Sequence, residues 1–259
     1  MSGSPVVAGS LSVVGLGPGS PGALTPDAAA AVESADALYG YGPYLARVPE
    51  RPGQVRHASD NREEGARAAA ALRHAADGAH VALLSGGDPG VFAMAAAVCE
   101  QIEGGVDTWR SLNVTIVPGV TAMLAVAARV GAPLGHDFCA ISLSDNLKPW
   151  DVVERRLDGA ASGGFVIALY NPISRARPWQ LGAALERLRR HLPASTPTVF
   201  GRAIGRADEK VVVTSLGAAD PSSADMATLI IVGSAFTRVI DRPGLMPLVY
   251  TPRSVAGSS

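Results

Sequence analysis

The chain has 259 residues, a formal net charge of −1 and only 17% charged residues. This length allows one large or two small domains with a sizeable core, and the near-neutral charge excludes the electrostatic footprint of a nucleic-acid or anionic-membrane binder. No apolar run approaches the ~20 residues that span a bilayer, and the N-terminus lacks the basic and apolar regions of a signal peptide. We therefore expect a soluble, cytoplasmic protein with no nucleic-acid or membrane partner.

Cysteine and histidine are sparse. Cys99 and Cys139 are too isolated for a disulfide framework, and neither has a His or Cys partner at metal-ligand spacing. The five histidines show no such spacing either. We expect no metal site, and we expect both cysteines to be buried as small hydrophobic side chains.

The N-terminal half alternates strand-like runs with helical stretches. Helices fill the gaps between the runs: Thr25, Pro26 and Asp27 have the residue types of an N-cap and first turn, and a second helical pattern ends at Gly78. Such alternation predicts a mostly parallel sheet. The strand-like runs cover residues 11–17, 37–40, 80–85 and 112–119.

After about residue 130 the strand-like runs follow one another more closely, and the pair within 199–216 has the pattern of an antiparallel pair. A Gly/Pro-rich stretch, 129-RVGAPLGHD, marks the expected domain boundary. The sequence predicts an α/β fold of two α/β domains, residues 10–128 with a mostly parallel sheet and 129–245 with a mixed sheet. The later runs cover residues 138–143, 164–172, 197–205, 210–216 and 226–234.

The first candidate ligand loop is 13-VVGLGPGSPGALTPDAA. Its glycines follow a strand, but a dinucleotide fingerprint needs its third glycine where this chain has Ser20, and needs a helix at once. Pro18 and Pro21 delay the helix until Thr25. The stretch is therefore either a tight turn or a loop for another kind of ligand.

The second candidate is 84-LSGGDPGVFAMA. A P-loop would place a lysine after its last glycine, and no lysine lies near Gly86. Glycines let backbone approach a ligand closely, and Asp88 can accept hydrogen bonds from hydroxyls or an amine. The stretch indicates an uncharged or cationic ligand; the alternative is a strand-to-helix turn with Asp88 as a helix cap.

Two further stretches are candidates for ligand binding. Pro118-Gly119 turns directly into a helix that has Thr121 in its first turn, so free amides and a hydroxyl lie beyond a strand end. A Tyr-Asn-Pro sequence at 170–172 precedes Arg175 and Arg177, which joins an aromatic surface to carboxylate-binding guanidinium groups. The alternative for the arginines is a solvated helix start.

Four motifs in order, "VVGLGPGSPGALTPDA", "LLSGGDPGVFAMA", "VPGVTA" and "MATLIIVG", resemble those of the tetrapyrrole methylase family over about residues 11–240. The stretches "YGYGPYL", "FCAISLSDNLKPWDVVERRL" and "ALYNPISRARPWQL" resemble the branch that methylates C17 of precorrin-3B and contracts its ring to give precorrin-4 in cobalamin biosynthesis. The resemblance implies an S-adenosylmethionine-dependent methyltransferase with the cofactor in a cleft between its domains. It also implies a homodimer.

The resemblance also implies roles for individual residues. The residues implied for the cofactor are Gly87, Asp88, Val91, Phe92, Thr121, Ala122, Tyr170, Ala203, Thr228 and Leu229. The first glycine loop then faces the polycarboxylated substrate, so we assign Gly15, Gly17, Pro18, Gly19, Arg175 and Arg177 to it, with Arg47 and Arg202 as further cationic candidates. Asp88, His57 and Glu63 are candidate acid/base groups.

Three alternatives stay open. The substrate could be that of another corrin methyltransferase, or the cobalt-containing form of the anaerobic route. A member of a different functional class, an adenosylmethionine-binding scaffold subunit, would carry the same motifs. One departure concerns Asp60-Asn61, where the branch commonly has Gly-Met, which leaves the substrate-side role of this segment undefined.

Overall fold

The structure, a computed structural model, describes residues 9–60, 63–174 and 176–254. The chain divides into two compact units, Met1–Thr121 and Ala122–Ser259. The sequence predicted a boundary near residue 128. Helix α5 (Ala122–Val130) instead belongs to the second unit, where it packs on strands β9 (Pro197–Arg202) and β11 (Thr228–Val232).

The first unit contains one five-stranded sheet in the order β3-β2-β4-β1-β5, and all its pairs are parallel, as predicted. The edge strand β3 was not predicted, because its short half-exposed sequence VRHAS has no apolar run. The strands are β1 (Ser10–Gly15), β2 (Ala37–Tyr41), β3 (Val55–Ser59), β4 (His80–Ser85) and β5 (Asn113–Val117).

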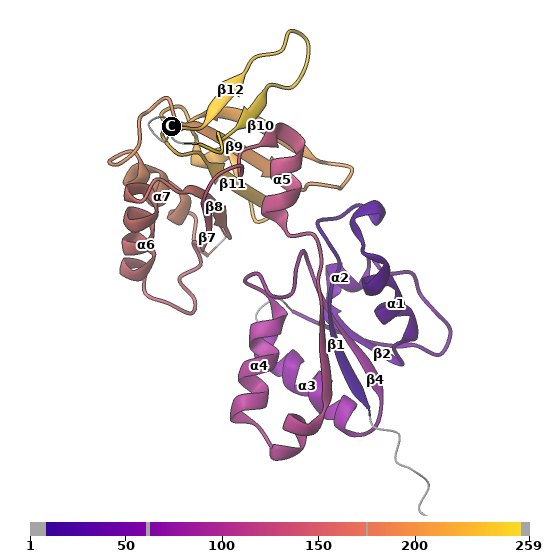
Figure 1. Cartoon of the computed structure of the whole chain (residues 1–259). Coiled ribbons are helices and arrows are strands. Elements are labelled where there is room, and N and C mark those ends of the chain that lie inside the picture. Colours follow the sequence, from indigo (N-terminus) through magenta and orange to yellow (C-terminus); the bar gives the residue numbers. More distant parts are fainter. Residues whose placement is uncertain (1–8, 61–62, 175, 255–259) are drawn as a thin grey trace, which may run out of the picture. The chain divides into compact units, whose positions relative to one another are not determined.

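Helices cover both faces of this sheet (Figure 1). Helices α3 (Glu64–Ala76) and α4 (Met94–Gly104) pack on one face, and α1 (Pro26–Ser34) and α2 (Gly42–Leu45) on the other. As predicted, Thr25 caps α1, since its Oγ1 accepts from the Ala28 N–H at 3.2 Å. Two short 3-10 helices, Pro21–Ala23 and Asp107–Ser111, complete the unit.

The second unit has a mixed sheet in the order β10-β9-β11-β8-β7, also as predicted. Only β8 and β7 run parallel; the three other pairs are antiparallel, including the β9–β10 pair. The parallel pair places two carboxyl strand ends side by side, at Ser142 and Tyr170. The remaining strands are β7 (Phe138–Ser142), β8 (Val166–Tyr170) and β10 (Lys210–Ser215).

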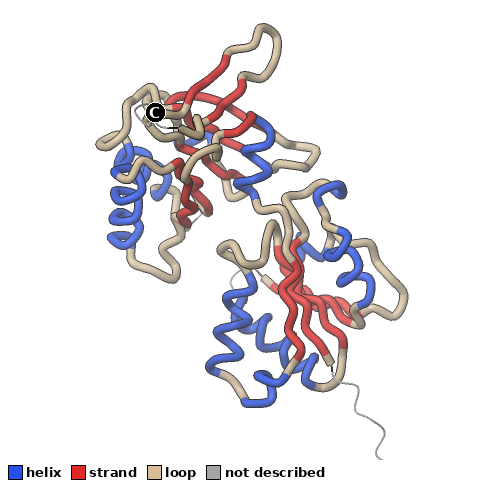
Figure 2. Tube along the Cα trace, in the orientation of Figure 1, coloured by secondary structure: helices blue, strands red, loops and turns tan. Residues whose placement is uncertain are grey.

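Helices α6 (Trp150–Ser162) and α7 (Gln180–Leu188) pack on one face of the mixed sheet around fully buried leucines such as Leu157 and Leu185. Figure 2 shows α5 on the opposite face. A small sheet of β12 (Arg238–Ile240), β13 (Leu248–Tyr250) and β6 (Gly131–Ala132) was not predicted, since its strands have only two or three residues. A 3-10 turn spans Pro221–Ser223.

The two cysteines differ in their surroundings. Cys99 is exposed on α4, so the prediction that it is buried is wrong; it lies one position beyond Val98, which takes the inward face of the helix. Cys139 is partly buried beside the core of the second unit, and burial raises the pKa of its thiol. Within the described part of the chain, no helix is both long and apolar enough to cross a membrane.

Candidate active site

Three loops meet at the carboxyl edge of the parallel sheet, one after each of the neighbouring strands β4, β1 and β5. Gly17 and Gly87 exchange a pair of backbone hydrogen bonds, at 3.1 and 3.0 Å, which joins the first glycine loop to the second. Both glycines have a left-handed backbone, with φ of 66° and 65°. Only glycine adopts this conformation without steric cost, so the residue types fit their places.

Gly15 and Gly119 bring the backbones into direct contact. A Cβ on Gly119 would lie 2.3 Å from the Gly87 carbonyl oxygen, and one on Gly15 would lie 2.7 Å from the same oxygen. These glycines are therefore needed for space. The edge is built from backbone, and no lysine precedes Lys148 anywhere in the chain.

Asp88 ties two of the loops together. Its Oδ1 accepts from the Gly90 N–H at 2.8 Å, and its Oδ2 accepts from the Gly119 N–H at 3.0 Å. The helix-cap alternative is wrong, because α4 begins at Met94 with Ala93 at its N-cap position. The carboxylate holds the second glycine loop and the Pro-Gly turn in one arrangement.

The second glycine loop has strained backbone shortly after Asp88. Phe92 has φ of 52°, uncommon for a non-glycine residue, and the residue is 51% exposed, while Val91 beside it is half-buried. Such conformations cost about 1–3 kcal/mol and cluster at functional sites, where the surrounding structure holds them. On the other side of the loop, a Cβ on Gly86 would lie within 2.6 Å of the Tyr44 ring. The loop therefore lies directly against Tyr44.

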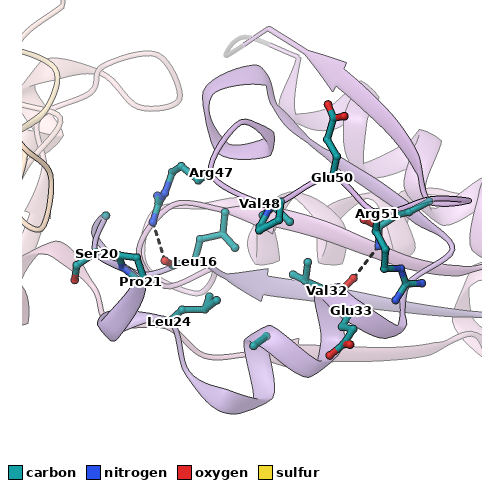
Figure 3. Close-up of a pocket in the computed structure, with 14 residues that line it drawn as sticks. Leu16, Ser20, Pro21, Leu24, Val32, Glu33, Arg47, Val48, Glu50 and Arg51 are labelled. Atoms are coloured by element: carbon teal, nitrogen blue, oxygen red, sulfur yellow. Dashed lines mark hydrogen bonds between the residues drawn. The ribbon is translucent and has the colours of Figure 1, made fainter.

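A pocket of about 540 Å³ opens beside the first glycine loop, between that loop, α1 and residues 47–54 (Figure 3). Its walls are mostly apolar, and it has two acidic and two basic side chains, Glu33, Glu50, Arg47 and Arg51. Figure 3 shows Arg47 pointing toward Leu16; its Nη2 donates to the carbonyl oxygens of Leu16 at 2.8 Å and Gly17 at 3.1 Å. Gly19 lines the pocket, and Pro18 lies next to it in the chain.

A buried arginine, Arg67, contacts the start of α4, the helix that follows the second glycine loop. Arg67 is 5% exposed; its Nε donates to Ser59 Oγ at 2.6 Å and its Nη1 donates to Met94 Sδ at 3.4 Å, while Nη2 donates to the Asp60 carbonyl. Burial lowers its pKa, while nearby glutamate charges oppose the shift. Arg67 thereby fixes the start of α4 relative to the end of β3.

The second unit has its own strained positions at strand ends. Tyr170 ends β8, and its hydroxyl accepts from the Met123 N–H at 3.1 Å. Asn171 and Ala203 follow β8 and β9 with φ of 51° and 50°. Asparagine tolerates this region, but alanine there carries the steric cost in full.

The start of β11 lies next to these turns. Thr228 and Leu229 are 5% and 3% exposed. Thr228 Oγ1 donates to Asp225 Oδ1 at 2.8 Å, and Arg202 Nε donates to Asp225 Oδ2 at 2.7 Å. Pairing of β11 with β8 covers only Ile230–Val232, because the chain leaves β8 at Asn171. The hydroxyl of Thr228 therefore stabilises the turn before β11, and Leu229 pairs with Gly201 of β9 but has no pairing partner on β8.

Thr121 and Ala122 stand at the junction of the two units. Thr121 is 6% exposed and is the last residue of the first unit, while Ala122 is the first residue of α5.

Arg177 does not point to open solvent. Its Nη1 donates to Asp145 Oδ1 at 2.7 Å, so the solvated helix-start alternative is wrong for this residue. Arg175 lies outside the described residues. Asp145 carried no signal in the sequence, since nothing in its neighbourhood singles out one acid in an irregular loop.

The acid/base candidates are dispersed. His57 lies in the middle of β3, stacked on Tyr39 with ring centroids 4.3 Å apart; burial lowers its pKa, and the charge of His74 lowers it further. Glu63 is exposed just before α3, where its Oε2 accepts from the Asp60 N–H at 3.0 Å. Neither hydrogen-bonds to a glycine loop in the described structure, whereas Asp88 does.

Two α/β units, the first with glycine-built loops at its carboxyl strand ends, agree with the class that the motifs indicated. Residues 10–220 match the model of the Tetrapyrrole (Corrin/Porphyrin) Methylases, and the chain therefore belongs to this family. The match confirms the resemblance seen in the four motifs.

Within the family, the chain is 64% identical over 251 residues to the precorrin-3B C(17)-methyltransferase of Sinorhizobium sp, a match that covers 97% of this chain and 99% of that protein. It is 39% identical to the probable cobalt-factor III C(17)-methyltransferase of Salmonella typhimurium, over 93% of this chain and 99% of that one. The crystal structure of the methyltransferase CobJ superposes with a TM-score of 0.90 at 47% identity, covering 94% of this chain and 100% of that chain.

Proposed function

We propose that this methyltransferase transfers a methyl group to C17 of precorrin-3B and contracts the macrocycle to give precorrin-4, as a cytoplasmic enzyme of cobalamin biosynthesis. The observation that carries the proposal is the 64% identity, over nearly all of both chains, to a protein of that name. The cobalt-factor III relative is only 39% identical, which favours the metal-free substrate.

The cofactor of the proposed reaction is S-adenosylmethionine, which supplies an electrophilic methyl group on a positively charged sulfur. The first unit suits such a ligand, because the loops at its carboxyl edge are joined by backbone contacts and by the Asp88 carboxylate, and no lysine for phosphates precedes Lys148. Gly87, Val91 and Phe92 would hold it from the second glycine loop. Further contacts would come from Thr121, Ala122, Tyr170, Ala203, Thr228 and Leu229.

The unpaired side of β11 supports these contacts. The pairing with β8 begins only at Ile230, while Leu229 pairs with Gly201 of β9, so the β8 side of β11 is open at its start, where a planar group such as an adenine could lie. The left-handed turn at Ala203 follows the neighbouring strand β9. Hydrogen bonds from backbone select shape and polarity without adding charge, which fits a ligand that is itself cationic at sulfur.

The substrate would face the first glycine loop. Gly15, Gly17, Pro18 and Gly19 give a surface of backbone and small side chains beside the 540 Å³ pocket. Arg177 would bind a carboxylate of the macrocycle. The chain contributes by holding donor and acceptor atoms in line, since orientation alone supplies several kcal/mol of a transfer barrier. Asp88, His57 and Glu63 remain our candidates for proton transfer during ring contraction.

The function is tested by turnover. Purified protein with labelled S-adenosylmethionine should methylate precorrin-3B and release precorrin-4, identified by mass spectrometry, and should act poorly on the cobalt-containing form. A preference for the cobalt form would support the anaerobic alternative. Binding of S-adenosylhomocysteine by calorimetry with no turnover on either substrate would support the scaffold alternative, and tight binding of NAD in its place would exclude the methyl donor.

We further propose that the enzyme is a homodimer. The hairpin of β12 and β13 exposes apolar side chains at Val239, Ile240, Leu245 and Met246, and apolar surface of this kind is typical of subunit interfaces. Light scattering after size exclusion should give twice the chain mass, and a Leu245→Glu variant should shift the protein toward monomer. A monomeric wild-type protein at micromolar concentration would contradict the proposal.

A further inference from the structure

A polar cluster covers the carboxyl ends of β7 and β8 in the second unit. It is formed by Asp145 and Lys148 from the loop after β7 and by Arg177 and Gln180 at the start of α7. Asp145 Oδ1 accepts from Arg177 Nη1 at 2.7 Å and from Gln180 Nε2 at 3.2 Å. Carboxyl ends of parallel strands are where α/β proteins bind ligands, so this position is a place for substrate contact.

The Asp145–Arg177 ion pair is reachable from water. The side chains are 24% and 23% exposed. One nitrogen of the guanidinium makes the bond, whereas an arginine can grip a carboxylate with two parallel hydrogen bonds. The pair is therefore not the strongest one that Arg177 can form.

A buried amide oxygen lies in the same cluster. Gln180 is 2% exposed, and its Oε1 accepts no hydrogen bond from any described residue. A buried polar atom without a partner is costly, so the present arrangement does not satisfy every group in the cluster.

Positive charge exceeds negative charge here. Lys148 Nζ donates to the Ser144 carbonyl at 3.0 Å. Burial lowers the pKa of Lys148, the charge of Arg156 lowers it further, and Asp145 opposes both. The cluster therefore has two cations and one carboxylate, which is paired with Arg177, and a third cation, Arg156, lies near Lys148. Lys148 lies three residues after Asp145 in the same loop, so a displaced Asp145 carboxylate would have a second cation in that loop.

We propose that Asp145 is a built-in competitor for the substrate: its carboxylate holds Arg177 in the free enzyme and is replaced there by a carboxylate of the macrocycle, while Lys148 takes over Asp145. This inference rests on the proposed function. The exchange keeps Arg177 paired in both states, so no unpaired guanidinium is left partly buried at any stage. Asp145 thereby sets how strongly a substrate carboxylate must bind, which makes it a specificity-determining residue.

Two substitutions have opposite expected effects. Asp145→Asn removes the competitor with little change of shape, and should lower the KM for precorrin-3B roughly two- to fivefold, the range of a partly exposed ion pair. Lys148→Gln removes the position that receives Asp145, and should raise that KM. The double variant Asp145→Asn with Arg177→Gln should have the high KM of Arg177→Gln alone, because the gain acts through Arg177.

Controls separate this inference from the function on which it rests. Asp151→Asn removes a carboxylate from an exposed ion pair with Arg155 in the same unit and should leave KM unchanged. All variants should bind S-adenosylhomocysteine like wild type, and circular dichroism should show that they fold. If wild type turns over precorrin-3B but Asp145→Asn has an unchanged or higher KM, Asp145 only anchors Arg177 and the exchange is wrong. If wild type itself has no turnover, the proposed function fails and this inference fails with it.

Discussion

Gly119 shows how a single hydrogen atom in place of a side chain determines the site. A Cβ on Gly119 would lie 2.3 Å from the Gly87 carbonyl oxygen and 2.8 Å from the Gly15 carbonyl oxygen. Both neighbours are backbone atoms, one in the second glycine loop and one at the end of β1, and cannot give way as a flexible side chain would. The three loops after β1, β4 and β5 therefore depend on this residue for their contact.

We predict that Gly119→Ala lowers the free energy of unfolding by about 1–3 kcal/mol, the usual cost of overpacking, and weakens S-adenosylhomocysteine binding. Gly22→Ala is the matched control, because a Cβ there meets no atom within 4 Å and the change should stay within about 0.5 kcal/mol. Urea titration and calorimetry measure the two effects. Equal stability of the two variants would show that the loops separate easily.

Asp88→Asn keeps the size of the side chain but replaces one acceptor oxygen with a donor. Since both oxygens accept backbone N–H groups of Gly90 and Gly119, one bond is lost and two donors face each other. We predict a loss of about 1–3 kcal/mol in stability together with weaker cofactor binding. Thermal unfolding with and without S-adenosylhomocysteine measures both. Weaker binding at unchanged stability would mean that Asp88 contacts the ligand and does not tie the loops.

For single residues, the sequence identifies those whose type is unusual for their surroundings. Gly87 and Asp88 stood out because glycines and an acid interrupt a strand-to-helix connection. Tyr44, Arg67 and Asp145 did not, because a tyrosine in a short helix, an arginine in a charged helix and an acid in a loop are common. The resemblance to a family placed Ala203 at the cofactor, but no property of alanine signals a φ of 50°.

Among the helices and strands, α6 and α7 are joined by a cluster of charged side chains that lies away from the strand ends. Asp158 on α6 accepts from Arg187 Nε and Nη2 on α7, at 2.8 and 2.6 Å, and from His191 Nε2 at 2.9 Å. The bonds from Arg187 come first among the causes that lower the pKa of Asp158 from 3.8 to about 2. The carboxylate therefore binds protons less readily in the folded than in the unfolded chain.

We predict that Asp158→Asn destabilises the protein by about 1 kcal/mol at neutral pH, a value reduced by solvent screening of a partly exposed pair. Because the folded-state pKa is the lower one, this stabilisation is present above pH 3.8 and is lost as the pH falls toward about 2. Urea unfolding of wild type and variant at a series of pH values measures the difference. Asp151→Asn is the control, and a difference that grows on acidification would contradict the assignment.

The sequence predicts elements in proportion to their length and burial. The continuous apolar runs of β1, β4, β8 and β11 were all found, since buried parallel or central strands have this pattern. The edge strand β3 and the short strands β6, β12 and β13 were missed because they bury few side chains. The antiparallel β9–β10 pair was recognised from its close spacing.

For the whole molecule, the position of α5 decides where one unit ends. The Gly/Pro-rich stretch after residue 128 indicated a boundary there. Glycine and proline residues, however, show where a helix ends and not which sheet the helix covers. Val126 and Val130 are fully buried, and a Cβ on Gly201 of β9 would lie 2.3 Å from Val126 Cγ2. The glycine in β9 therefore makes room for α5, which packs on the mixed sheet.

We predict that a fragment of residues 122–259 unfolds cooperatively, whereas a fragment of residues 129–259 is less stable by several kcal/mol. Burial of each valine side chain contributes about 1.5–3 kcal/mol, and removal of α5 leaves β9 and β11 uncovered on one face. Extending a first-unit fragment from residue 121 to residue 128 should add no stability, because these residues would have no sheet to cover. Urea unfolding followed by circular dichroism compares the four fragments. Equal stability of the two second-unit fragments, or a gain on extending the first unit, would place the boundary near residue 128, where the sequence pattern indicated it.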